Sequence, residues 1–193
     1  MRNLRKTKNQ GFVPYPQSIA SASSLLLLVP AIAFGQDLVW QGAVSEDFNE
    51  QTAWNPQQAP TSSDFLEFDQ TGTSTVTFSS DGNSDLTEFR EGTFVFQTGS
   101  NEWTNVDAFR VGSKSGQVVD VTFDGGTLTQ SGGNQIQVGE NAGDDNNTLT
   151  LVNGATATGS STAVDVVGRE GAGKTFDVLC GSTFTTFRFS IGQ

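Results

Sequence analysis

Three stretches of this sequence decide its fold, because they align with one another: VVDVTFDGGTLTQ (Val118 to Gln130), NTLTLVNGATATG (Asn147 to Gly159) and KTFDVLCGSTFTT (Lys174 to Thr186). Each begins with alternating apolar and polar residues, passes through a glycine and continues as a second alternating run. Strict alternation is typical of a strand with one buried face, and glycine between two such runs marks a turn. Each stretch therefore predicts two short strands joined by a tight corner.

Alignment on the glycines of these corners, Gly126, Gly154 and Gly181, stacks the apolar residues of the three stretches. Two inward columns result: Val121, Leu149 and Phe176 in one, and Phe123, Leu151 and Val178 in the other. Because a charge buried in such a column has no partner, aspartate at Leu151 or Val178 is expected to unfold the chain.

A second marker recurs every 24 to 29 residues, as FRVG (Phe109 to Gly112), IQVG (Ile136 to Gly139), VVG (Val166 to Gly168) and FSIG (Phe189 to Gly192). A repeat of this length, made of short strands with glycine corners, fits one coil of a β-helix, in which each strand pairs with its equivalent in the next coil. The sequence therefore predicts an all-β fold, a parallel β-helix of about 4–5 short coils over residues 81–193.

Residues 36–80 contain aromatic residues spaced by turn residues in place of the repeat pattern. They are expected to form an N-terminal cap and the first strands, since the end of a solenoid must be covered. The aromatic residues Trp40, Phe48 and Trp54 suit such a cap. The alternative is that Trp40, Trp54 and Trp103 form an exposed platform for stacking sugar rings.

Between cap and repeats, DLTEFREGTFVFQTG (Asp85 to Gly99) predicts a less regular coil with Phe89, Phe94 and Phe96 in its core. Its turn is expected at Gly92. Because Gly92 precedes Gly126 by 34 residues, an insertion is expected around SNEWTNVD (residues 100–107).

Residues 1–35 predict a secretory signal peptide, with a basic start, an apolar run too short to span a bilayer, and Ala33 and Gly35 before a cut that precedes Gln36. The alternative is an N-terminal membrane anchor that is left uncut. After removal of this segment, six basic residues remain against 21 acidic ones, a net charge of −15. Such a surface repels nucleic acid and suits a secreted or cell-surface protein. The chain has one cysteine, so it cannot form an internal disulfide.

The octapeptide GREGAGKT (Gly168 to Thr175) matches the phosphate-binding pattern G-x-x-x-x-G-K-[ST]. A working phosphate loop opens a helix, whereas the sequence after Thr175 alternates like a strand. The octapeptide also occupies the place of GSKSGQ (Gly112 to Gln117) and GENAGDDNN (Gly139 to Asn147) in the preceding coils. We therefore expect a variable loop and no nucleotide cofactor, with Arg169 and Lys174 as loop charges that help solubility. Lys174→Ala is expected to be harmless.

No catalytic, cofactor-binding or metal-ligating residue is predicted. The chain contains no histidine, so the commonest zinc sites and catalytic triads lack a usual member. The acidic loop with Glu140, Asp144 and Asp145 could hold Ca²⁺, but the calcium-binding nonapeptide is missing and a solvated turn is expected. Cys180 shares a corner column with Gly125 and Asn153, which favours a turn residue over a nucleophile.

The pattern W-x-G…W…P…D…F, here Trp40, Gly42, Trp54, Pro60, Asp64 and Phe68, precedes coils such as TLTLVNGATATG. In this it resembles the secreted bacterial β-helical proteins with autotransporter-associated β-strand repeats, many of which end in a PEP-CTERM sorting tail. The resemblance covers Leu38 to the end and implies a right-handed helix on a bacterial exterior with surface display, adhesion or matrix roles. The chain contains neither a C-terminal translocator barrel nor a sorting tail.

The marker FSIG, which recurs once in each coil, lies just before Gln193 and predicts the start of another coil. We expect the N-terminal part of a longer protein; the alternative is a short module that covers its open coil with a partner or with its own copy. The expected function is a non-catalytic structural, adhesive or matrix solenoid, with other surface proteins or glycans as partners. The alternative is a β-helix that binds or cleaves glycans, for which the acidic residues would have to be clustered.

Overall fold

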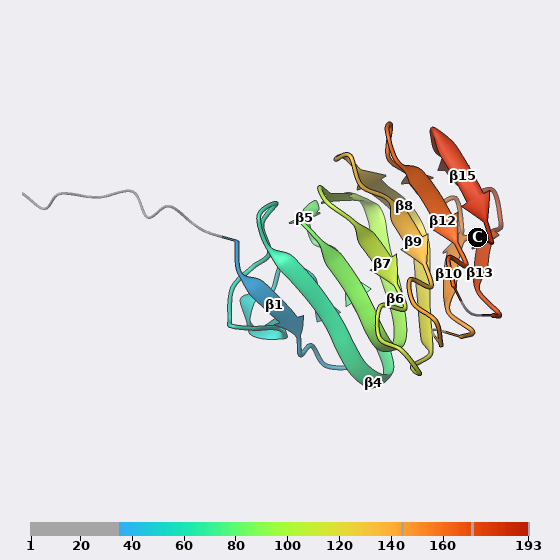
Figure 1. Cartoon of the computed structure of the whole chain (residues 1–193). Coiled ribbons are helices and arrows are strands. Elements are labelled where there is room, and N and C mark those ends of the chain that lie inside the picture. Colours follow the sequence, from blue (N-terminus) through green and yellow to red (C-terminus); the bar gives the residue numbers. More distant parts are fainter. Residues whose placement is uncertain (1–34, 144, 171, 193) are drawn as a thin grey trace, which may run out of the picture. The chain divides into compact units, whose positions relative to one another are not determined.

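The computed structural model describes residues 35–143, 145–170 and 172–192 and is built almost entirely of β-strands. It forms a parallel β-solenoid of about six turns (Figure 1). The predicted fold is therefore confirmed. The coil number is higher than predicted because residues 36–80, in addition to the cap, contribute the stacked strands Asp37–Trp40, Ser45–Asp47 and Phe65–Thr77. The predicted signal peptide lies outside the described residues, except for Gly35.

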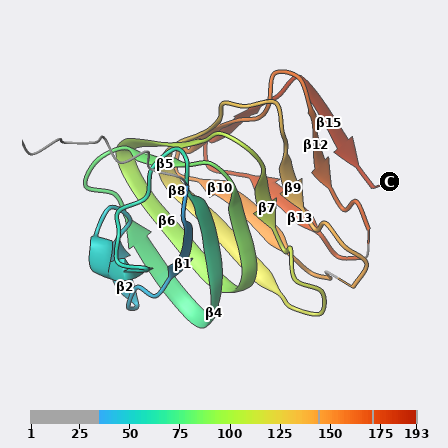
Figure 2. The same cartoon turned by 60° about the vertical axis from the view of Figure 1, so that its left-hand side comes forward.

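The strands stack in three faces, which Figure 2 shows from a second side. The first face contains β1 (Asp37–Trp40), the start of β4 (Phe65–Thr77), the start of β6 (Thr87–Asn105), β7 (Phe109–Val111), β9 (Ile136–Val138), β12 (Val164–Val167) and β15 (Arg188–Ile191). The second face contains β2 (Ser45–Asp47), the end of β4, the middle part of β6, the start of β8 (Val119–Gln130), β10 (Thr148–Val152) and β13 (Thr175–Val178). The third face contains β5 (Gly82–Ser84), the ends of β6 and β8, β11 (Thr156–Thr158) and β14 (Thr183–Thr185).

The predicted columns are present in the observed register. Leu149 pairs with Val121 on one side and with Phe176 on the other, and Leu151 pairs with Phe123 and Val178. The markers that end in glycine form β7, β9, β12 and β15 on the first face.

The corners between the second and third faces use left-handed backbone in two successive residues. The first of the pair is Gly125, Asn153 or Cys180, with φ of 78°, 56° and 52°. Glycine and asparagine adopt this region readily, and Cys180 takes it as a turn residue. A Cβ on Gly126 would lie 1.8 Å from Thr98 Oγ1, so the second position also excludes larger residues in that coil.

For the less regular coil that was expected from Asp85 to Gly99, the predicted position of the corner was wrong. Gly92 pairs with Val119, whereas Gly99 pairs with Gly125. SNEWTNVD is not an insertion, because its Trp103 pairs with Leu128 as part of the third face. The error arose because Gly92 and Gly126 mark different corners of the coil.

Aromatic rings fill the interior at the N-terminal end. Phe68 and Phe89 stack at 4.7 Å between centroids, and Phe96 and Phe123 at 5.2 Å. At the end itself, β3 (Trp54–Asn55) pairs antiparallel with β1, and the 3₁₀ helix η1 (Gln51–Ala53) precedes it. Trp40 and Trp54 meet edge to face at 5.0 Å, which confirms an aromatic cap.

The opposite end differs, because its interior side chains are incompletely covered. Phe176, Phe184 and Phe189 form a triangle with centroid distances of 4.8 to 5.9 Å. Phe189 and Val178 are exposed, although they occupy inward columns. Val178 was thus wrongly predicted as a buried position, because no described strand lies beyond β13.

We expect Leu151→Asp to unfold the protein, while Val178→Asp leaves it folded. Leu151 is 0% exposed and Val178 is 40% exposed, so only the first carboxylate is buried without a partner. That burial costs several kcal/mol, comparable with the whole stability of a domain, about 5–15 kcal/mol. Circular dichroism and urea unfolding measure both variants. Equal losses of stability would contradict the assigned difference in burial.

Candidate functional site

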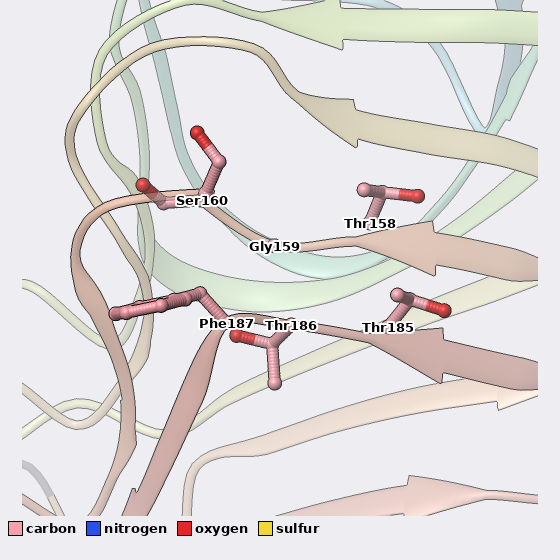
Figure 3. A pocket seen from close by; sticks show the side chains of 7 residues that line it. Thr158, Gly159, Ser160, Thr185, Thr186 and Phe187 are labelled. Atoms are coloured by element: carbon pink, nitrogen blue, oxygen red, sulfur yellow. The ribbon is translucent and has the colours of Figure 1, made fainter.

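A pocket of about 260 Å³ lies where the third face turns towards the first face, between the last two turns of the solenoid (Figure 3). Its wall consists mainly of hydroxyl-bearing residues with one aromatic ring: Thr158, Gly159, Ser160, Ser161, Thr185, Thr186 and Phe187. Phe187 is 65% exposed, and the guanidinium carbon of Arg188 lies 5.8 Å from the centre of its ring. The surface that these residues expose to the pocket is predominantly apolar, because hydroxyls such as those of Ser160 and Thr186 already hydrogen-bond within the protein.

Gly159, one of the lining residues, departs from the pattern of the other coils, and Asp165 fills the space that its side chain would take. In the preceding coil the equivalent position, one residue after the Thr129–Thr158 pair, is Gln130. In the coils before that, Asn105 and Ser84 occupy it. These three polar side chains form a buried ladder, with Asn105 accepting from Ser84 at 2.8 Å and donating to Gln130 at 2.7 Å. At Gly159 the ladder is interrupted.

A buried carboxylate, Asp165, stands beside this interruption. Its Oδ1 accepts a hydrogen bond from the backbone nitrogen of Ile136 at 2.7 Å, and its Oδ2 accepts one from the Thr186 hydroxyl. A Cβ on Gly159 would lie 1.9 Å from Asp165 Oδ2. Burial raises the pKa of Asp165 against the opposing effect of these hydrogen bonds. The carboxylate thus joins successive coils, and the sequence analysis missed it although an acidic residue interrupts the apolar run VDVV.

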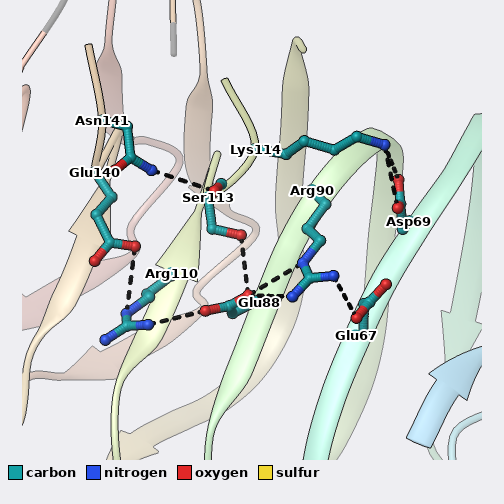
Figure 4. Close-up of polar contacts among 9 residues, drawn as sticks. All are labelled: Glu67, Asp69, Glu88, Arg90, Arg110, Ser113, Lys114, Glu140 and Asn141. Atoms are coloured by element: carbon teal, nitrogen blue, oxygen red, sulfur yellow. Dashed lines mark hydrogen bonds and ion pairs between the residues drawn. The ribbon is translucent and has the colours of Figure 1, made fainter. Parts of the chain in front are cut away.

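A ladder of ion pairs crosses the outside of the first face (Figure 4). Arg90 bridges Glu67 at 2.6 Å and Glu88 at 3.0 Å, and Arg110 continues from Glu88 at 2.8 Å towards Glu140 at 3.6 Å. Beside the ladder, Lys114 pairs with Asp69 at 3.1 Å, and this hydrogen bond raises the lysine pKa. These three cations are all the basic residues between 36 and 163, so the ladder neutralises carboxylates that the stacking places side by side.

The octapeptide GREGAGKT leads into β13, a strand, as predicted. Lys174 is not the free loop charge that was expected. Its side chain is 2% exposed, lies over Gly139 of the preceding coil, and places its Nζ 3.7 Å from Asp145. The ammonium group also donates to the backbone oxygen of Glu170. The lysine side chain therefore serves contacts between and within loops.

The acidic loop likewise contacts its neighbours. Glu140 lies in the ion-pair ladder, and Asp145 Oδ1 accepts from the backbone nitrogen of Ala172 at 2.7 Å. Asp144 lies outside the described residues. Among the residues that are described, no three acidic or cysteine side chains are grouped as a metal would require.

The tryptophan platform for sugars is wrong, because all three indoles are buried. Trp40, Trp54 and Trp103 are at most 1% exposed. Trp54 Nε1 donates to the Phe48 carbonyl at 2.8 Å, and Trp103 Nε1 donates to Ser84 Oγ at 2.9 Å. Their residue type suited both a core and a sugar site, and the sequence could not distinguish the two.

Comparison with family models, curated proteins and solved structures gives no match. No helix in the described part of the chain has the length and apolarity needed to cross a bilayer. The assignment of function therefore depends on the geometry of the solenoid itself.

We expect Lys174→Ala to destabilise the protein by about 1–2 kcal/mol, because the substitution removes a covered side chain and its ion pair. The exposed neighbour Arg169 provides the control, and Arg169→Ala should change stability by less than about 0.5 kcal/mol. Urea denaturation compares the variants. Equal stabilities for the two would show that Lys174 is an ordinary surface charge.

We expect wild-type protein to gain stability relative to Asp165→Asn as the pH falls from neutrality. The raised pKa means that ionised Asp165 is less favourable in the folded than in the unfolded chain. This penalty is fully present above the folded-state pKa of Asp165. It decreases as the carboxylate is protonated and is lost below about pH 4, the pKa of an ordinary Asp in the unfolded chain. Urea unfolding of both proteins across this pH range gives the difference. A difference that is constant, or that shifts in favour of the variant at low pH, would contradict the assignment.

Proposed function

We propose that this protein is a non-catalytic solenoid of the cell exterior, with a structural or adhesive role exerted through its C-terminal coil. The observation that carries the proposal is the contrast between the two ends of the stack. An aromatic cap covers one end, whereas the other presents apolar side chains and strands that pair on one side only among the described residues. Secretion and a surface location follow from the predicted signal peptide, and the resemblance to β-helical surface proteins agrees with this role.

The apolar side chains of the C-terminal coil are numerous for an exposed surface. Ile191 is 75% exposed, and Phe187, Phe189, Leu179 and Val178 are also exposed. Large exposed apolar groups beside unpaired strand edges favour association, because a partner strand satisfies the backbone while it covers the side chains. We infer that this end accepts the edge strands of a partner, either a second copy or another surface protein.

The charge distribution supports association at this end. Residues 36–163 contain three basic and 18 acidic residues, so two such bodies repel each other. Residues 164–193 contain three of each, namely Arg169, Lys174, Arg188, Asp165, Glu170 and Asp177. The C-terminal coil is therefore the region where close approach of another acidic chain costs least.

The second candidate is a glycan-binding module, with the pocket of Figure 3 as its site. The exposed ring of Phe187 and the apolar surface beside it are the groups on which a sugar ring would stack. We propose no nucleic-acid or nucleotide partner for either candidate, in view of the net negative charge and of the strand that follows GREGAGKT.

Sedimentation of the full chain at several concentrations tests the first candidate. We expect self-association that Val178→Lys with Ile191→Lys abolishes, because two charges would be placed in the contact. Val44→Lys is the matched control, since Val44 is equally exposed, at 76%, near the capped end. A wild-type protein that is monomeric at all concentrations, or a Val44→Lys protein that dissociates as well, would contradict self-association through this coil. Binding to immobilised polysaccharides that Phe187→Ala removes would instead favour the glycan module.

A further inference from the structure

The outside of the third face carries threonine in a regular array. The motif Thr-x-Thr occurs at Thr127 and Thr129 in β8, at Thr156 and Thr158 in β11, and at Thr183 and Thr185 in β14. The strand register pairs Thr156 with Thr127 and Thr183, and Thr158 with Thr129 and Thr185. The six residues form two parallel columns across three coils, and Thr104 extends one column by a further coil.

The array is accessible and uncharged. Thr183 and Thr185 are exposed and the other four threonines are partly exposed, while the residues between them, Leu128, Ala157 and Phe184, point inward. The three segments TLT, TAT and TFT contain no charged residue, although the chain as a whole is strongly acidic. The second face lacks this regularity, since its outward columns include Val95, Asp120 and Asp177.

The spacing of this array follows from β-geometry. Neighbouring strands lie about 4.8 Å apart, and residues i and i+2 of one strand lie about 6.7 Å apart. In ice each oxygen has four tetrahedral neighbours at an oxygen–oxygen distance of about 2.75 Å. Two oxygens that share a neighbour therefore lie about 4.5 Å apart, and the lattice repeat along the hexagonal axis is eight thirds of the oxygen–oxygen distance, about 7.3 Å. Both spacings of the threonine array agree with those of ice within about a tenth.

The side chain itself suits an ordered water surface. Each threonine offers a hydroxyl that donates and accepts, together with a methyl group, and β-branching restricts its χ1 angle. A rigid array loses little entropy when water orders against it. Thr183 Oγ1 donates to Thr156 Oγ1 at 3.2 Å, so the hydroxyls of this pair lie closer together than the strand spacing, although the two residues keep the common backbone register.

We propose that the third face binds ice through its threonine columns. Crystalline water repeats in two dimensions with spacings close to these, whereas a single sugar would use one pocket and one ring. The inference does not depend on association through the C-terminal coil. Three coils form a small array, so the activity expected is shaping of ice crystals and inhibition of recrystallisation.

The test uses the purified full chain in buffer frozen to a polycrystalline film. We expect wild-type protein to keep the ice grains small and to enter a slowly growing ice front, where tryptophan fluorescence reports its partition. In Thr156→Lys with Thr158→Lys, the concentration needed to inhibit recrystallisation should rise by about tenfold or more, corresponding to about 1.4 kcal/mol of binding free energy. Thr148→Lys with Thr150→Lys in β10 is the matched control, because it places the same charges on the second face of the same coil.

The melting temperature of each variant separates loss of binding from loss of fold. Thr156→Val with Thr158→Val, which keeps the shape and the methyl groups, should retain more activity than the lysine pair. Wild-type protein that leaves ice growth unchanged would overturn the proposal. So would equal loss of activity in the two lysine variants, since binding would then not depend on the third face.

Discussion

The structure depends on one constraint, the in-register pairing of each strand with its equivalent in the next coil. A single coil of this chain has two or three short strands and cannot enclose its own apolar side chains. Stacking places Phe68 on Phe89 and Phe96 on Phe123, and it satisfies the backbone in the same step. Because the side-chain period of a strand is two residues, a slip of one residue would expose a whole column and bury charged residues.

The same register orders the outside of the solenoid. Carboxylates that repeat at an outward position become neighbours, and Arg90 and Arg110 lie between them in the ladder of the first face. Threonines that repeat on the third face become two columns with the spacing of the β-sheet. Regular outer surfaces thus arise without separate folding interactions, whereas Gly159 is a position at which one coil departs from the others and a buried carboxylate takes the place of a side chain.

The ends of the stack are the positions where the constraint is not met by another coil. At the N-terminal end, an antiparallel strand and aromatic rings replace the missing neighbour. At the C-terminal coil, Phe176, Phe184 and Phe189 pack on one another and stay partly accessible. The balance of charge in that coil and its exposed apolar side chains support the proposal that this coil contacts a partner.

The sequence by itself determined the repeat, the two inward columns and the glycine corners, because alternation and turn residues are local signals that stacking preserves. It did not determine which corner Gly92 belongs to, since coils of about 20 to 29 residues contain several equivalent corners and only strand pairing distinguishes them. Tertiary structure alone decided that Trp103 is core, that Lys174 is covered, and that Val178 is accessible. It also joined Asp165 to Thr186 and aligned the threonines of three coils. In each of these cases the deciding contact comes from a neighbouring coil, or from the absence of one, more than 20 residues away in the chain.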